Sequence, residues 1–461
     1  MSSVYGTRGS SFTSSLPLAA ALVLGGLLPP AACTSTSEGS DEGGPGDAQA
    51  GAGGGTSSGG RAGGATGASS GGASSGGTTG GSAGTGSGGN AGSAPVSAGA
   101  WPTGWSKRRS AKPTLDALAN AWEGGLPLLV SVAVEGSEGI QAPADAGKLR
   151  VLDKNGQPVP YELDSVRNGK ALVWIRFPTP DTAVWIYTAP TAAAPAAPDP
   201  ADVWGDEDSV WHLEASGLES GPRAHDGLAD PEGPGVAFAE GFIGNGFVGD
   251  SSKKANLGLA RGEAADGRLL SGVKGFTISA WVKATDLALL GDKPFDRAIL
   301  SVGTDATDSN YNHASGVLAI GLAKSNDAGG KVVVGARPRG DMETVTSEGA
   351  VPQNQWTHVA GVVDMKSKQG RLFINGEAAS AWLSMGDLEL DAFPADHKAK
   401  STHIGASAGG QYGYFDGVLD EIRLSRVMRS DAYLKAVFAN MRDPQATISV
   451  GPVESNNGEG P

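Results

Sequence analysis

The chain has 461 residues, of which 35 are Lys or Arg and 49 are Asp or Glu, so its formal net charge is −14 at pH 7. An acidic chain without a basic block is unsuited to bind nucleic acid or an anionic lipid surface, and we exclude both partner classes. The single cysteine excludes a disulfide within one chain, so packing must stabilise the fold, with or without a metal ion.

The first 33 residues have the order of segments typical of an export signal. The apolar run 16–28 is shorter than the roughly 20 residues that span a bilayer, and Ala31, Ala32 and Cys33 follow it. Residues 1–33 resemble a bacterial lipoprotein signal, which implies cleavage before Cys33 and lipid on its sulfur and new amine. The protein would then be exported and held at the outer membrane or cell surface by a lipid anchor only. The alternative is an ordinary secretory signal cut nearby.

Residues 34–100 consist almost entirely of Gly, Ser, Ala and Thr. Such a segment cannot bury enough apolar surface to offset its ordering entropy, so we expect a disordered linker. A flexible coil of this length reaches about 45 Å, enough to hold a folded domain clear of a membrane surface. The last residues, 452–461, are predicted to be a disordered tail.

A small all-β module is predicted for residues 101–188. Turn residues recur about every ten positions between apolar, β-branched and aromatic runs, as in a β-sandwich. Asn155-Gly156 provides one of these turns, because both residues tolerate a left-handed backbone. The expected strands cover residues 126–134, 149–152, 159–163, 171–177 and 183–187.

The order of these features resembles a bacterial domain family of unknown function, number 2341 in its naming series. The resemblance rests on Trp105 with Arg108 and Arg109, on the segment 160–163 (PYEL) and on the segment 173–175 (VWI). It implies no known chemistry. Residues 189–202 then form an Ala/Pro hinge that favours extended backbone, so we expect the two modules to be spaced rather than fused.

The second folded region is predicted for residues 203–451, and its clearest element is the hairpin 356–376, WTHVAGVVDMKSKQGRLFING. Two β-branched runs flank a polar loop, and Asn375-Gly376 suits a tight type I′ turn after the second strand. Ser430 can cap a short helix. Further strands are expected at residues 210–213, 238–248, 276–282, 298–302, 316–322, 331–336, 380–383, 401–405, 417–424 and 446–450.

A dozen short strands with hardly any helix predict two packed antiparallel sheets, so the fold class is all-β. The segments VWHLE, FTISAWVK, WTHVAGVVD, LFINGE and FDGVLDEIRLSRVMRS, in this order, resemble a bacterial laminin-G-like, concanavalin A-like jelly roll. The resemblance implies one structural calcium ion in the loops at a sheet edge. Asp420, in the motif G-x-x-D-E, is the expected calcium ligand, with Glu219 as its partner from the first loop.

Glucanases share this fold, so a catalytic carboxyl pair is the main alternative. Retaining glycosidases place two carboxyls about 5–5.5 Å apart. Glu389 and Asp391 begin the pattern E-x-D-x-x-E, but Pro394 occupies the position of its second Glu. Asp420 and Glu421 are adjacent and are expected to point to opposite faces of a strand. The sequence therefore predicts no assembled acid/base pair.

Tyr311, Tyr412 and Tyr414 lie in predicted loops, where their rings can stack on a sugar face. The predicted function is non-catalytic binding of glycan or of a cell-envelope protein by a cell-surface lipoprotein. Two alternatives stay open. One is a glycoside hydrolase whose carboxylates come from distant strands, and the other is a structural envelope component without a soluble ligand.

Overall fold

The computed structural model describes residues 101–114, 120–191, 197–205, 208–215, 220–221, 236–258, 271–287, 295–304, 318–324, 330–338, 341–393, 399–407 and 412–456. Ser87–Pro461 form one compact unit. The predictions for the signal with Cys33, for the linker, and for Glu219 and Tyr311 therefore lie outside the described residues. None of the helices among these residues is long and apolar enough to cross a membrane.

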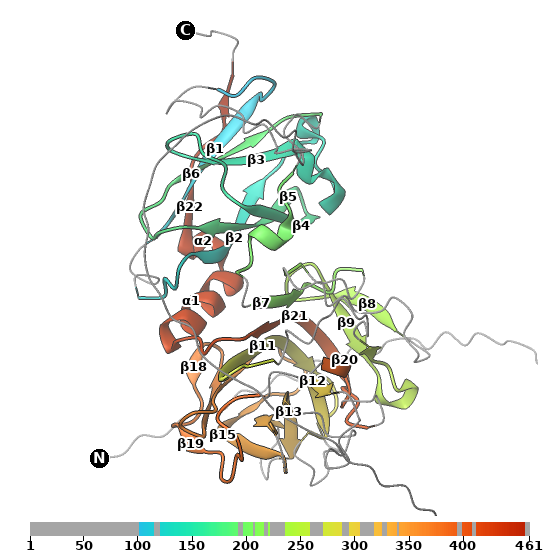
Figure 1. The fold of residues 1–461 in the computed structure, drawn as a ribbon. Helices are drawn as coiled ribbons and strands as arrows, with labels where there is room; N and C mark the ends of the chain where they lie inside the picture. The colour runs from blue at the N-terminus through green and yellow to red at the C-terminus, as the bar shows by residue number, and fades with distance from the viewer. Residues whose placement is uncertain are drawn as a thin grey trace, which may run out of the picture. The chain divides into compact units, whose positions relative to one another are not determined.

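The first module contains two antiparallel sheets (Figure 1). The three-stranded sheet has the order β2–β5–β4, with β2 Leu126–Ala133, β5 Lys170–Phe177 and β4 Tyr161–Arg167. The five-stranded sheet has the order β22–β1–β6–β3, and β23 also pairs with β1. Its strands are β22 Ile448–Val450, β1 Lys107–Pro113, β6 Val184–Thr188, β3 Leu149–Asp153 and β23 Glu454–Ser455. Short 3-10 helices are η2 Gly136–Glu138, η3 Pro143–Lys148 and η4 Pro200–Asp202.

The predicted strands β2, β3, β5 and β6 are confirmed, and β4 begins two residues later than expected. The turn after β3 is also confirmed. Gly156 has φ 74°, and the Asp153 carboxylate accepts hydrogen bonds from the amides of Asn155 and Gln157, each at 2.8 Å. Strand β1 was not predicted, because its sequence KRRSAKP lacks the apolar run that marks a strand.

The C-terminal strands differ from the prediction. Residues 446–450 were expected to close the jelly roll, and residues 452–461 to be a tail. Instead β22 and β23 pair with β1 of the first module, with Ala111 opposite Val450 and Arg108 opposite Glu454. A strand's partner is not encoded in its own pattern, and β1 would otherwise present an unpaired edge.

The second module is a sandwich of a six-stranded and a nine-stranded antiparallel sheet, so the all-β fold class is confirmed. The first sheet is β10 Leu257–Gly258, β20 Ala399–Ile404, β12 Arg297–Thr304, β13 Leu318–Lys324, β14 Gly330–Ala336 and β15 Glu343–Val351. The second is β18 Glu377–Ala378, β17 Gln369–Ile374, β16 Thr357–Asp364, β11 Gly275–Ala284, β21 Gly417–Ser425, β9 Asn245–Gly249 and β8 Ala237–Glu240. Strands β19 Leu383–Ser384 and β7 Asp208–Trp211 pair with β17 and β21. The 3-10 helix η5 spans Ser251–Lys253.

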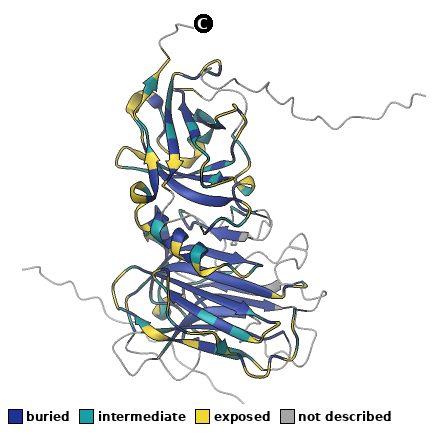
Figure 2. Ribbon diagram, turned by 90° about the vertical axis from the view of Figure 1, so that its left-hand side faces the viewer, coloured by how far each residue is buried: buried dark blue, intermediate teal, exposed yellow. Residues whose placement is uncertain are grey.

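The hairpin that anchors this sandwich is confirmed as β16 and β17. Asn375 and Gly376 follow β17 with φ angles of 51° and 74°, the positive values that a type I′ turn requires. Between the two sheets lies one apolar cluster, in which Ile278 and Val363 pack with Val334 and Phe415. Figure 2 shows buried residues concentrated on the strands and exposed residues on many of the turns.

The outer face of the nine-stranded sheet is covered as well. Helix α1 Asp431–Arg442 is capped by Ser430, whose hydroxyl accepts a hydrogen bond from the Tyr433 amide, as expected for that serine. Leu434, Val437 and Phe438 of α1 share a buried cluster with Trp281 of β11. Helix α2 Pro444–Thr447 follows and leads into β22.

The expectation that the two modules are spaced is wrong. The cluster under α1 also contains Leu128 and Trp174 of the first module. The amide of Leu129 donates to Asn440 Oδ1 at 2.7 Å, and Asn440 Nδ2 donates back to the Leu129 carbonyl at 3.0 Å. An Ala/Pro segment restricts only its own backbone, so apolar surface on both sides of it can still meet. We call this contact between the modules the junction.

Candidate functional site

Strand β21 carries the residues that organise the junction, and an irregularity in the strand aims them. Its register with β11 shifts, so that Asp420 lies opposite Trp281 and Arg423 lies opposite Ser279. Two residues of β21 therefore face one residue of β11, which is a β-bulge. Glu421 sits in this bulge with φ 48°, a left-handed conformation that is uncommon for a side chain of its size.

The bulge corrects one prediction. Adjacent Asp420 and Glu421 were expected to point to opposite faces of the strand. Asp420 instead shares a face with Trp281, which packs under α1, and the Glu421 carboxylate also reaches the junction on that side. Both side chains are fully buried. Neither acid is accessible as half of a hydrolytic pair.

Asp420 binds backbone amides. Its Oδ2 accepts hydrogen bonds from the amides of Phe242 and Ile243 at 2.7 and 2.8 Å, and its Oδ1 accepts one from the Glu421 amide at 2.8 Å. Burial raises the pKa of Asp420 well above its ordinary value. Because N–H donors face both oxygens, the residues described around Asp420 do not fit a calcium site. The other expected ligand, Glu219, lies outside the described residues.

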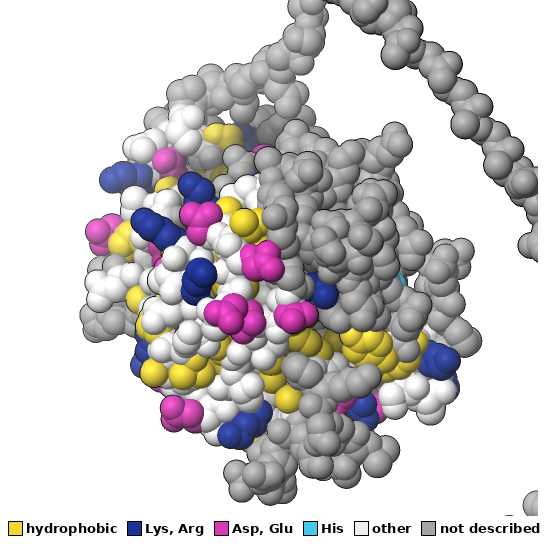
Figure 3. Space-filling model, turned by 60° about the horizontal axis from the view of Figure 1, so that its bottom comes forward, with side chains coloured by type: hydrophobic (Ala, Val, Ile, Leu, Met, Phe, Trp, Pro, Cys, Tyr) yellow, Lys and Arg dark blue, Asp and Glu magenta, His cyan; other side chains and the backbone are white. Residues whose placement is uncertain are grey.

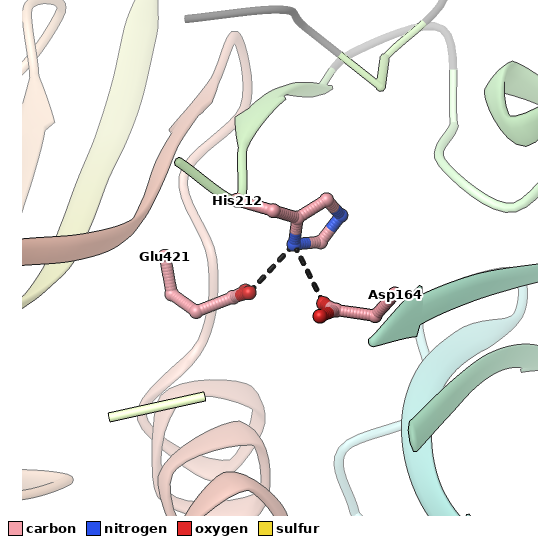
Figure 4. A group of neighbouring side chains, drawn as sticks. All are labelled: Asp164, His212 and Glu421. Atoms are coloured by element: carbon pink, nitrogen blue, oxygen red, sulfur yellow. Dashed lines mark hydrogen bonds and ion pairs between the residues drawn. The ribbon is translucent and has the colours of Figure 1, made fainter. Parts of the chain in front are cut away.

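His212, which follows β7, lies among three carboxylates, and Figure 4 shows it with two of them, those of Asp164 and Glu421. Its Nδ1 is 2.6 Å from Glu421 Oε1 and 3.2 Å from Asp164 Oδ2, and its Nε2 is 3.3 Å from Glu162 Oε2. Glu162 and Asp164 belong to β4 of the first module, whose register with β5 also shifts between Leu163 and Ser165. We call His212, Glu162, Asp164, Glu421 and Arg423 the junction cluster.

Aromatic rings enclose the junction cluster. The guanidinium of Arg423 lies over Trp174 and Trp204, 4.5 and 4.7 Å from the ring centroids, and its Nη2 donates to Glu421 Oε2 at 2.8 Å. The N–H groups of the same two indoles donate hydrogen bonds to the carboxylates. Trp174 donates to Asp164 Oδ2 and Trp204 to Glu162 Oε2, each at 2.9 Å. The rings therefore exclude water and also supply hydrogen bonds.

Burial and mutual charge set the protonation states. Burial alone would lower the pKa of His212, but Glu421, Glu162 and Asp164 outweigh it and hold that pKa well above its usual value. Burial alone would raise the pKa of Glu162 and of Glu421, but His212 outweighs it and keeps both below their usual range. Burial raises the pKa of Asp164 to about 7, because His212 and Trp174 offset it only in part.

These protonation states nearly balance the buried charge. The cations His212 and Arg423 face the anions Glu162 and Glu421, and Asp164 is partly protonated near neutral pH. A buried charge without a partner is costly, whereas a paired and hydrogen-bonded one is tolerated. The cluster is therefore arranged as an ionic and hydrogen-bonded clamp across the junction.

A metal ion is the competing interpretation of the junction cluster. One ligand atom each from Asp164, His212 and Glu421 lies within 4.8 Å of the others. A metal needs an unprotonated histidine nitrogen. Here both ring nitrogens of His212 face carboxylate oxygens at hydrogen-bonding distance, and the Trp174 N–H occupies Asp164 Oδ2. This geometry fits a protonated imidazole better than a metal complex.

The other predicted site residues lie apart from the junction cluster. Tyr412 and Tyr414 are half-buried in the loop before β21. The Ser407 amide donates to the Tyr412 carbonyl, and the Tyr412 amide donates to the Ser407 hydroxyl. Burial raises the pKa of Tyr414. Glu389 and Asp391 are exposed in bends rather than on a strand, so the catalytic pattern that they begin has no strand geometry.

The junction cluster was not predicted, although the segments that form it stand out in the sequence. His212 belongs to VWHLE, Glu162 to PYEL, and Glu421 to FDGVLDEIRL. The segments indicated a family resemblance, but these three residues were given no role. Charged residues inside otherwise apolar strands were the available signal, because such residues are seldom buried without partners.

Comparison with known proteins supports the fold of the second module. Residues 260–434 match the family Laminin_G_3, described as the concanavalin A-like lectin/glucanases superfamily. These residues form a concanavalin A-like domain. The domain includes β21 with Asp420 and Glu421, whereas His212 precedes the matched range. No curated protein matches the chain.

Three solved structures are similar to parts of the chain. Domain 4 of AbnA, a GH43 extracellular arabinanase from Geobacillus stearothermophilus, is 19% identical over 50% of this chain and 87% of its own, with TM-score 0.31. The CBM40 of the Ruminococcus gnavus IT-sialidase, bound to α2,3-sialyllactose, is 25% identical over 39% and 88%, with TM-score 0.29. The botulinum neurotoxin serotype G binding domain is 11% identical over 50% of each chain, with TM-score 0.35. At these TM-scores the similarities say nothing about function.

Proposed function

We propose that the chain binds glycan, or a cell-envelope protein, without chemical turnover, through its concanavalin A-like domain. The observation that carries the proposal is that the carboxylates brought together by the fold are enclosed and already hydrogen-bonded. Glu162, Asp164 and Glu421 converge, but they are enclosed by Trp174 and Trp204 and bonded to cations or N–H donors. A substrate would reach them only if the modules separated. Because these acids are closed to a substrate, the sandwich is better suited to bind a ligand than to hydrolyse one.

The ligand-binding surface of the domain must lie elsewhere than on the outer face of the nine-stranded sheet, because that face is covered. The first module and α1 occupy the outer face of the nine-stranded sheet. The loop that holds Tyr412 and Tyr414 stays partly exposed, and its rings suit stacking on a sugar face. Figure 3 shows acidic, basic and hydrophobic side chains interspersed on the end of this domain. Mixed charge of this kind favours a neutral ligand over a highly charged one.

The proposal includes the location of the protein. Cys33, preceded by an apolar run and two alanines, suits lipid attachment after export, and the Gly/Ser-rich linker 34–100 suits a stalk at the outer membrane or cell surface. The membrane is then contacted through the anchor only. Mass spectrometry of the mature N-terminus tests this part, and an unmodified Cys33 would contradict it.

Binding and turnover are tested together on the purified full chain. A glycan array should give specific binding, and a parallel assay for new reducing ends should give none. Tyr412→Ala with Tyr414→Ala should weaken binding at least tenfold, while Trp382→Ala, at a 41% exposed side chain elsewhere, should not. Release of reducing ends would favour the glycoside hydrolase. Absence of any ligand would favour a structural envelope component.

A further inference from the structure

The outer face of the five-stranded sheet carries aromatic and basic side chains side by side. In the register of β1 with β6, Arg108 lies opposite Tyr187 and Ser110 lies opposite Trp185. Side chains alternate between the faces of a strand, so these four project away from Ile186, which belongs to the buried core. Trp185 and Tyr187 form a small separate cluster with Trp101, Trp105 and Leu152.

Arg108 is held between two indoles. Its guanidinium carbon lies 4.7 Å from the ring centroid of Trp101 and 4.3 Å from that of Trp185. Trp101 meets Tyr187 edge-on, with ring centroids 5.7 Å apart. The Nε of Arg108 donates to Glu454 Oε2 at 2.7 Å. Trp101 and Trp185 are both partly exposed, and the Glu454 side chain is 43% exposed.

We propose that Trp101, Arg108, Trp185 and Glu454 form a second glycan-binding platform, which takes a neutral sugar chain. The proposal goes beyond the proposed function, because the platform lies on the first module and not on the concanavalin A-like domain. Each indole packs one face on Arg108, and its opposite face would present π-electron density to the weakly positive C–H groups of a sugar ring. The guanidinium and carboxylate beside them can donate to and accept from neighbouring hydroxyls. Arg108 and Glu454 neutralise each other, so the platform has no surplus charge with which to select an acidic sugar.

The platform is formed before any ligand arrives. Arg108 is fixed by two rings and one carboxylate, so little side-chain freedom remains to be lost on binding. Glu454 comes from β23, at the far end of the chain from Trp101, and reaches Arg108 only because β23 pairs with β1.

The test uses the purified full chain and six-residue oligosaccharides of glucose (β-1,4 and β-1,3), xylose and N-acetylglucosamine, with hexagalacturonate as the acidic probe. Binding is followed by calorimetry and by tryptophan fluorescence. At least one neutral probe should bind. Trp101→Ala and Trp185→Ala should each weaken its binding at least tenfold. Trp185→Phe keeps a stacking face and should stay within about threefold. Trp382→Ala is the matched control and should stay within twofold. Thermal melting confirms that each variant is folded.

The outcomes separate the platform from the proposed function. Neutral binding that is unchanged in Trp101→Ala and Trp185→Ala but lost when Tyr412 and Tyr414 are replaced overturns the platform and leaves the proposed function standing. Neutral binding lost only in the two tryptophan variants supports the platform and moves binding out of the concanavalin A-like domain. Preference for hexagalacturonate overturns the platform. Failure of every probe to bind the unmodified chain overturns the platform, whereas the proposed function stands or falls by the glycan array.

Discussion

The two faces of the nine-stranded sheet are both apolar in large part, but only one of them also buries charged side chains. One face packs against the six-stranded sheet through aliphatic and aromatic side chains, including Leu419 and Ile422 of β21. The other face meets the first module through the apolar cluster under α1 and also through the junction cluster, to which the same strand contributes Glu421 and Arg423. One strand therefore supplies apolar groups to the core and charged groups to the junction, and the bulge at Glu421 separates the two sets.

The two kinds of contact have different effects: one stabilises the fold, and the other fixes how the two modules are oriented. Burial of apolar surface is favourable in almost any arrangement, because the hydrophobic effect is not directional. A buried charge is tolerated only with its partners in place, so a charged cluster penalises every other placement of the two modules. We infer that the core of the concanavalin A-like domain stabilises the fold and that the junction cluster fixes the position of the first module on it.

The largest expected effect comes from removing the central cation. His212→Ala leaves Glu162, Asp164 and Glu421 buried without the imidazolium that they share. Breaking a buried ion pair in this way typically costs about 3–5 kcal/mol. Chemical denaturation of the variant should show a loss of this size. A loss below about 1 kcal/mol would mean that the cluster does not clamp the junction.

The pH dependence of stability sharpens the comparison, because apolar packing does not titrate. Asp164 has an ordinary pKa of 3.8 and a folded pKa of about 7, raised by burial. Between these values the folded chain holds a proton that the unfolded chain has released, so the free energy of unfolding falls as pH rises. The raised pKa of His212 acts in the same direction at higher pH: its contribution is complete below 6.5 and is lost as pH rises through the folded value.

Asp164→Asn provides the matched control for this pH dependence. The variant keeps the shape of the side chain and removes its titration. We expect the free energy of unfolding, measured by chemical denaturation from about pH 4 to about pH 7, to fall by up to a few kcal/mol for the unmodified chain. It should fall by less for the variant. Equal slopes for the two proteins would contradict a buried, protonated Asp164.

A second buried histidine tests whether burial alone explains the effect at His212. His358 on β16 is 1% exposed, and neither ring nitrogen has a hydrogen-bond partner among the described residues. Burial lowers its pKa to about 3, so it is neutral. Replacing an unpaired polar group by an apolar one of similar volume is close to neutral or stabilising. His358→Leu should therefore change the free energy of unfolding by less than about 1 kcal/mol, and a loss as large as that of His212→Ala would contradict this account.

The smallest expected effect is that of chelation. Because backbone amides occupy the oxygens of Asp420, excess EDTA should shift the melting temperature by less than about 1 °C. The same result is expected for Asp420→Asn measured with and without EDTA. A larger shift in the unmodified chain that is absent from the variant would restore the predicted calcium ion.

The sequence predicted local structure well and the site poorly, for physical reasons. Alternation and turn residues locate strands such as β11 and the Asn375-Gly376 turn, because both depend on neighbouring residues. His212, Glu162 and Glu421 are brought together by tertiary packing across 259 positions (421 − 162). The bulge that aims Glu421 breaks the alternation from which its face was predicted.

If the junction cluster clamps the two modules, they must unfold as one cooperative unit. Differential scanning calorimetry of the full chain tests this directly. One transition, in which the calorimetric and van't Hoff enthalpies agree for the whole folded region, is the predicted result. Two resolved transitions, one for each module, would contradict it.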